Sequence, residues 1–259
     1  MRITSKNLQR TYLRGLNNNI KNLAESNERL NTGRRFTKLS QNVIDGSRAL
    51  NVRELLARNQ TFVGNAQQMQ LQLFSQEDKM MQIQNLVQDA KELMVRGYSD
   101  TNSADDKLII GNQVNAIKDS IVHIINSKSV DRYTFASFRN EAPITVEGPN
   151  VFFYGQNVND QENIFNQGSF KLSVGTKIDV EQSAIDVLGH GVDAQGLPNN
   201  LILLLDQIAN SITTDDKTHR KSFITKMNDQ ANELLMRISD VGMKTNYLET
   251  TLSRLSSEK

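Results

Sequence analysis

The chain has 259 residues, and its 30 Lys and Arg nearly balance its 29 Asp and Glu, for a formal net charge of +1. It has no Cys, which excludes disulfide scaffolds, zinc knuckles, iron–sulfur ligation and thiol nucleophiles. The first residues lack the apolar stretch of a signal peptide, and the densest aliphatic run, 201–205, is far shorter than the ~20 residues that cross a bilayer. We therefore expect neither a cleaved signal peptide nor a membrane partner.

Charge is unevenly distributed along the chain. Residues 1–60 carry 12 basic and 4 acidic side chains, a balance of +8, and the remainder carries −7. The basic residues are spread along a helical pattern and form no compact basic cluster of the kind that binds nucleic acid. We therefore expect no nucleic-acid partner.

The first helix is expected from Ser5 to Thr32, because apolar residues recur there at alternating steps of three and four and Gly33 can end the helix. So narrow a stripe needs a partner helix, and we expect residues 1–32 to become helical only when partners cover it. Asn27 takes one position of the stripe, where it either fixes the register of a helix pair or marks a loose end. The candidate assembly interface comprises Leu13, Leu16, Ile20, Leu23, Leu30, and Arg34 and Arg35 in the following loop.

A second, much longer helix is expected from Ser47 to Arg96, a stretch with no Pro and one Gly. At 1.5 Å per residue it would extend roughly 75 Å, so the molecule should be elongated. A capping-box-like start at Ser103 opens a third helix, which should end near Ser127 and fold back antiparallel. Helical stripes return after Pro198 and run to the end of the chain. The expected bundle core comprises Phe62, Met69, Leu73, Ile83, Val87, Ile117, Ile121, Leu234, Ile238 and Val241.

The segment between these helices has a different composition. Aromatic and β-branched residues concentrate in 132–185, which predicts a small β-rich insertion. The expected fold class is mainly α, an elongated antiparallel bundle of long coiled-coil-like helices with a small β-rich inserted domain. Along the chain, we expect 1–45 to form an assembly helix and loop, 46–131 and 198–259 to form the two parts of the bundle, and 132–197 to form the β-rich domain.

The sequence offers little that could carry catalysis. His123, His190 and His219 have no spacing that makes a metal pair. The acidic pairs at 105–106 and 215–216 are interpreted as helix starts, where the helix dipole stabilises negative charge. Most of the Met residues between 69 and 94 follow the apolar stripe, which favours core packing over a peptide-binding groove. We therefore expect no enzyme, no cofactor and no metal.

Several motifs together resemble the axial proteins of the bacterial flagellum. They are the opening Met-Arg-Ile-Thr, the Arg-Leu-Asn-Thr-Gly-Arg-Arg of 29–35 followed by Leu39 and Ser40, and the Val-Gly-Met-Lys-Thr-Asn-Tyr-Leu-Glu of 241–249. Within these proteins, the Arg-Tyr-Thr-Phe-Ala of 132–136 is similar to a strand of the hook–filament junction family, hook-associated protein 3. One departure is the Ser-Gln-Asn-Val of 40–43, where the family commonly has Ser-Asp-Asp-Pro.

The resemblance implies a structural adaptor between hook and filament that acts by helix–helix packing with neighbouring axial subunits. It implies an extracellular place in the flagellum, reached by export without a cleaved signal peptide. The implied partners are the first hook-associated protein, flagellin, copies of the chain in a ring, the flagellar export apparatus and an export chaperone. Family members also have a C-terminal helix that pairs with the N-terminal one in the innermost layer, so we expect that helix to be missing and the chain to be truncated.

Two alternatives stay open on the residues alone. A minor flagellin would polymerise by itself into filaments. A cytosolic coiled-coil signalling protein would form a continuous two-stranded dimer and would lack the β-rich insertion.

Overall fold

The computed structural model describes residues 5–38, 40, 42–129, 131–136, 139–159, 169–173, 176–179 and 182–257, with 169–173 and 176–179 described as backbone only. The opening motif at 1–4, Leu39 and the Gln at position 41 lie outside the described residues. The chain divides into two compact units, residues 1–58 and residues 59–259. Each unit is described separately below.

The first unit consists of helix α1 (Ser5–Thr32), a loop and the first turns of helix α2 (Val43–Gly97). Gly33 has φ +63°, the left-handed conformation that ends helices and that glycine adopts most easily, so the predicted end of α1 is confirmed. At the start of α2, the Asn42 side chain accepts a hydrogen bond from the Asp45 N–H at 3.0 Å. That bond satisfies one of the free donors of the first turn.

The conformation of α1 differs from one expectation. Residues 5–32 were expected to become helical only on assembly, but they form a continuous helix of 28 residues in the single chain. That length exceeds the ~12–15 residues below which isolated helices are marginal. The segment is therefore long enough to be helical before a partner covers its stripe.

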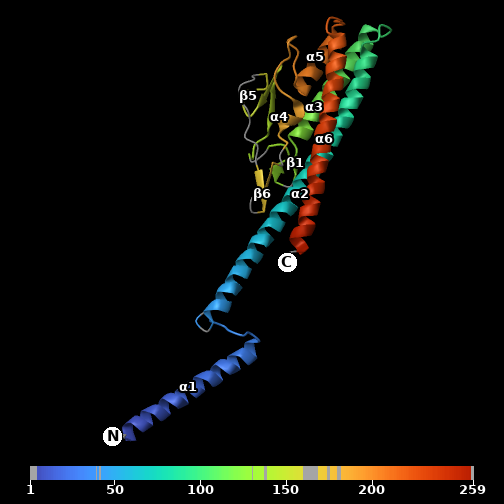
Figure 1. Ribbon diagram of the computed structural model, residues 1–259. Coiled ribbons are helices and arrows are strands. Elements are labelled where there is room, and N and C mark those ends of the chain that lie inside the picture. The colour runs from blue at the N-terminus through green and yellow to red at the C-terminus, as the bar shows by residue number, and fades with distance from the viewer. Residues whose placement is uncertain are drawn as a thin grey trace. The chain divides into compact units, whose positions relative to one another are not determined.

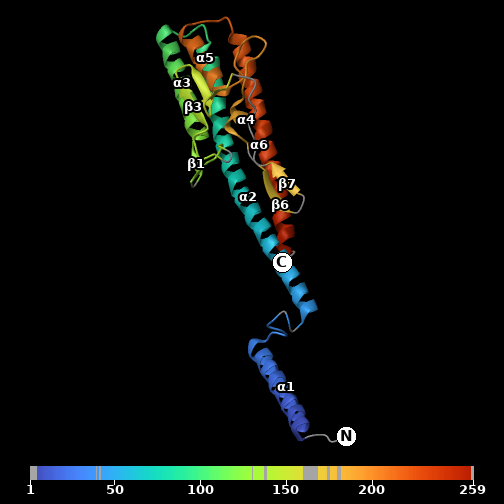
Figure 2. The same ribbon diagram turned by 90° about the vertical axis from the view of Figure 1, so that its left-hand side faces the viewer.

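The second unit is a bundle of helices with strands along one flank (Figures 1 and 2). It contains the rest of α2 together with α3 (Ala104–Ile125), α5 (Leu201–Thr213) and α6 (Arg220–Ser257). Helices α2 and α6 are antiparallel. The Asn59 side chain donates a hydrogen bond to the Leu255 carbonyl, and Gln70, further along α2, donates to Glu249, which comes earlier in α6. The expected class, a mainly α antiparallel bundle with a small β-rich insertion, is confirmed.

The core of this unit follows α2 at alternating steps of three and four residues. Met69, Met80 and Met94 are buried, whereas Met81 is off the stripe and 46% exposed. Of the residues expected in the core, Ile117 and Ile238 are half-buried and pack against it, and Phe62 is half-buried. The others are all buried: Met69, Leu73, Ile83, Val87, Ile121, Leu234 and Val241. Each full burial of such a side chain contributes about 1.5–3 kcal/mol.

Helix α3 starts with the predicted capping box. The Ser103 hydroxyl accepts from the Asp106 N–H, and the Asp106 carboxylate accepts from the Ser103 N–H. Helix α3 packs most closely on α5. The two backbones approach at Gly111, where an added Cβ would lie 3.1 Å from the Ala209 carbonyl oxygen and would collide with Thr213. Glycine at 111 therefore sets the spacing of these two helices, a contact that the sequence did not indicate.

Between α3 and α5, the described residues form seven short strands and one short helix. Strands β1 (Lys128–Ser129) and β2 (Arg132–Tyr133) pair antiparallel, and so do β6 (Ser169–Ser173) and β7 (Thr176–Asp179). Strands β3 (Ile144–Glu147), β4 (Asn150–Phe153) and β5 (Gln156–Asn157) form one antiparallel sheet in chain order. Helix α4 (Ala184–Leu188) was not predicted. Residues of this segment share one hydrophobic core with the helices: Ile144, Val151, Phe153, Val158, Ile185 and Leu188.

A polar contact also ties the β-rich segment to the helices. Gln76, fully buried on the core stripe of α2, donates from Nε2 to the carbonyls of Thr134 at 3.0 Å and Gln182 at 3.3 Å. The Gln182 side chain in turn donates to Asp240 and accepts from Arg237, both on α6. A buried amide is stable only when it is hydrogen-bonded, so this position specifies where the backbone of the segment lies.

The register of α2 is tested by Ile83→Asp, which places a carboxylate at a fully buried position. We expect a loss of more than about 3 kcal/mol in the free energy of unfolding, because a carboxylate buried in the hydrophobic core loses its hydration. The matched control, Asn85→Asp on the exposed side of the same helix, should cost less than about 0.5 kcal/mol. Urea unfolding followed by circular dichroism measures both, and equal losses would contradict the register.

Candidate assembly surface

Helix α1 presents an apolar surface to solvent, and none of its residues is buried. The five aliphatic residues expected in the assembly interface are between 43% exposed, at Leu16, and 81% exposed, at Leu30. Leu8 and Tyr12 are also exposed and extend this surface toward the N-terminus. Exposed apolar surfaces of this kind are typical of interaction sites, which makes this surface the candidate.

The two arginines of the expected interface lie in the loop after α1, and both are exposed. Arg35 is 3.9 Å from the Asp45 carboxylate, a loose ion pair in which the arginine side chain is 84% exposed. The Arg34 N–H donates to the Thr32 hydroxyl at 3.4 Å, and the Thr37 hydroxyl donates to Glu28 at 2.9 Å. These bonds hold the loop against the end of α1 and leave the Arg34 guanidinium accessible.

The first turns of α2 add apolar surface that the sequence analysis missed. Val52 and Leu55 are 63% and 62% exposed. They continue, at the same steps of three and four, the stripe that is buried from Ala66 onward, and this continuity in the sequence could have identified them. The exposed apolar residues of this stretch are Val43, Ile44, Leu50, Val52, Leu55 and Leu56.

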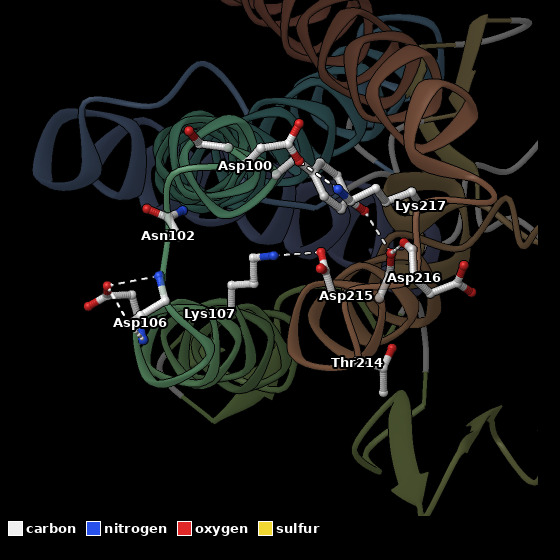
Figure 3. Close-up of polar contacts among 12 residues, drawn as sticks. Asp100, Asn102, Asp106, Lys107, Thr214, Asp215, Asp216 and Lys217 are labelled. Atoms are coloured by element: carbon white, nitrogen blue, oxygen red, sulfur yellow. Dashed lines mark hydrogen bonds and ion pairs between the residues drawn. The ribbon is translucent and has the colours of Figure 1, made fainter.

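At the tip of the second unit, ion pairs join the loop that follows α5 to the loop that follows α2 and to the first turn of α3 (Figure 3). Lys217 Nζ lies 2.6 Å from Asp100, and Lys107 Nζ lies 2.6 Å from Asp215. Lys107 is almost fully buried, with its side chain 10% exposed, so Asp215 is the counter-ion that makes its burial tolerable. Beside them, the Tyr98 hydroxyl is 3.2 Å from the Ser211 hydroxyl.

These contacts shift the titration of the groups involved. Hydrogen bonds from Lys217 and Lys107 hold the pKa of Asp100 and of Asp215, respectively, below the ordinary 3.8, and the bond to Asp100 raises the pKa of Lys217 above 10.5. Both carboxylates therefore stabilise the fold above pH 3.8, and that stabilisation is lost as the pH falls through their lowered pKa values. At the other end, the Lys217 contribution is lost only above pH 10.5.

The acidic pair at 215–216 does not start a helix, which corrects the interpretation from sequence. Helix α6 begins at Arg220, and Asp215 lies in the preceding turn with φ +53°, a conformation that Asp and Asn tolerate better than most residues. The Asp216 carboxylate accepts from the Thr218 N–H and hydroxyl. A local turn stabilised by side chains replaced the helix start that the two charges suggested.

The part of the chain that the structure describes has no candidate metal site. No group of three or more His, Asp and Glu there could hold a metal ion. His123 is exposed on the last turn of α3, and His219 lies against Phe223 at the start of α6. No helix among these residues is long and apolar enough to cross a bilayer.

The pattern of α1, the following loop and α2 to β2 matches a known family model. Residues 3–135 match the bacterial flagellin N-terminal helical region. The chain belongs to the flagellin family. As a member of this family, it is a structural component of the bacterial flagellum, as the sequence motifs predicted.

Relatives of this flagellin-family chain have a consistent description. The chain is 23% identical to flagellar hook-associated protein 3 of Escherichia coli, in an alignment that covers all of this chain and 84% of that protein. It is 27% identical to the Salmonella typhimurium protein of the same name, in an alignment that covers 55% of this chain and 45% of that protein. Among solved structures, hook-associated protein 3 of Legionella pneumophila superposes with a TM-score of 0.68 at 11% identity, covering 81% of this chain and 95% of that one. FlgL of Bacillus cereus gives 0.62 at 18%, covering 82% and 96%.

The ion pair at the bundle tip is tested by Asp215→Asn, which keeps a residue tolerant of φ +53° and removes the charge. We expect a lower melting temperature at pH 7, since the buried Lys107 loses its counter-ion. Adding Lys107→Met should recover part of the loss, and Asp89→Asn, at an exposed position of α2, is the control.

The same variant tests the direction of the pKa shift. The difference in melting temperature between the wild type and Asp215→Asn should shrink as the pH falls below 3.8 toward the lowered pKa of Asp215, because the wild-type carboxyl is neutralised first in the unfolded chain and then in the folded one. Thermal unfolding followed by circular dichroism at pH 7 and at pH 3 measures it. A difference that does not change with pH would show that the pair contributes nothing through charge.

Proposed function

We propose that the chain is the adaptor at the junction between hook and filament, and that it acts by packing its helices against neighbouring axial subunits. The support is that the E. coli relative aligned over the whole chain is named hook-associated protein 3, and that a solved Legionella pneumophila relative with a TM-score of 0.63 is named a flagellar junction protein. The partners on this proposal are the first hook-associated protein on one side, flagellin on the other, and copies of the chain in a ring.

The observation that carries this proposal is the exposed stripe of α1. Its steps of three and four are those of a coiled-coil seam, and none of its residues is buried in the single chain. Such a seam lowers the free energy only when another helix covers it. On this proposal, residues 1–45 are the assembly segment of the innermost layer, and 46–131 with 198–259 form the bundle that carries the β-rich domain at 132–197.

Export belongs to the same proposal. On this proposal the chain leaves the cell through the flagellar export apparatus, and the support is that its relatives are named flagellar hook-associated proteins. Before assembly, an uncovered apolar stripe is an aggregation hazard. An export chaperone that shields an assembly surface until delivery fits that requirement.

The seam is tested by Leu16→Asp with Leu23→Asp, two exposed stripe positions seven residues apart. The variant should keep the melting temperature of the bundle and should be secreted, but cells relying on it should have hooks without filaments. Thr11→Asp with Asn18→Asp, also seven residues apart but off the stripe, should assemble normally. Electron microscopy of complemented cells, with an immunoblot of the medium for export, measures the outcome.

Two outcomes would contradict the proposal. One is normal filament growth with the stripe variant. The other is polymerisation of the purified chain by itself into long filaments, which is the behaviour of a minor flagellin.

A further inference from the structure

The flanks of the α1 stripe differ sharply in charge. Projected at about 100° per residue, the basic side chains of the first five turns fall on one side of the stripe. That basic flank consists of Lys6, Arg10, Arg14 and Lys21, and residues 5–24 contain no Asp or Glu. The opposite flank carries neutral residues, among them Leu8, Asn19 and Ser26. One side of the seam therefore carries four positive charges and the other none.

The charges of the basic flank are not neutralised within the described chain. All four side chains are exposed, and none of them forms an ion pair with a described residue. Elsewhere the chain does pair its charges along helices, as Arg58 does with Glu54 and Arg237 with Glu233, each at 2.7 Å. The basic flank therefore retains its full charge for an intermolecular contact.

We infer that the helix covering the α1 stripe is acidic: an amphipathic helix whose apolar stripe is bordered, on the side facing Lys6, Arg10, Arg14 and Lys21, by Asp and Glu. This inference rests on the proposed function and adds the chemistry of the partner. In a ring, many copies of this basic flank come close together, and their repulsion must be offset by opposite charge. A partner helix with carboxylates facing the basic flank does both: it covers the apolar stripe and offsets the repulsion between the basic flanks.

Two other occupants fit less well. An antiparallel pair of α1 helices would place the basic flanks against each other, and a parallel pair would set each basic flank against a neutral one, so neither supplies a carboxylate. An anionic membrane surface would supply the charge. However, membrane-surface helices present a broad apolar face, whereas this stripe is narrow and has Asn27 in it.

The test uses the full chain and three synthetic 28-residue helices with identical apolar stripes, whose flank positions are Glu, Gln or Lys. Fluorescence anisotropy at about 50 mM salt should show the Glu helix binding about tenfold more tightly than the Gln helix, and the Lys helix more weakly than either. At about 500 mM salt the preference should largely disappear, because screening acts on exposed charges.

Variants make the assignment specific. Arg14→Glu with Lys21→Glu should abolish the preference, because the flank then carries two positive and two negative charges and the three helices bind about equally. The control, Lys221→Glu with Arg254→Glu, makes the same change in net charge at exposed positions of α6 and should keep the wild-type preference. Equal binding of the three helices by the wild-type chain would overturn the inference, and so would tighter binding to phosphatidylglycerol vesicles than to the Glu helix.

The outcome can be separated from that of the proposed function. If the Glu helix has no advantage while Leu16→Asp with Leu23→Asp still blocks filament growth, the acidic partner is wrong and the adaptor role stands. If the Glu helix is preferred but the stripe variant assembles normally, the adaptor mechanism is wrong and the charge preference of α1 remains.

Discussion

An apolar stripe that repeats at steps of three and four must be covered, and this constraint organises the whole chain. In the second unit it is satisfied internally, because the stripe of α2 from Ala66 to Met94 is buried among α3, α5, α6 and the β-rich segment. On α1, and at Val52 and Leu55 of α2, the same spacing is left exposed. One rule of helix packing thus stabilises the bundle within the single chain and leaves a surface whose burial depends on other molecules.

Much of this could be predicted from the sequence because helical periodicity is a local signal. The bounds of α1, the capping box at Ser103 and the left-handed Gly33 follow from residue types at fixed spacings. Helix α4, the α3–α5 contact at Gly111 and the Lys107–Asp215 pair depend on segments far apart in the chain, and no local pattern encodes them. The acidic pair at 215–216 misled because Asp215 pairs with Lys107 on α3 while Asp216 accepts bonds from Thr218 in a local turn. The candidate assembly residues were found as a stripe, and their role remains a proposal.

Polar contacts determine where the β-rich segment and the loops lie against the helices, which the apolar stripe alone does not. Apolar burial favours a bundle but does not by itself fix where an irregular segment lies against it. Gln76 bonds two carbonyls of the β-rich segment, the Lys217–Asp100 pair joins the two loops at the tip, and the Lys107–Asp215 pair joins α3 to the loop after α5. These contacts fix the β-rich segment and the loops against the helices of the second unit.

The central claim is that the α1 stripe is covered only by assembly. Hydrogen–deuterium exchange of residues 5–32 tests this most directly, in the free chain and in flagella isolated with hook and filament attached. We expect the α1 amides to exchange rapidly in the free chain while those around Ile83 are protected, because a helix without tertiary contacts opens easily. In the assembled flagellum, α1 should become as protected as the core of α2. Protection of α1 in the free chain equal to that of the core would contradict the account.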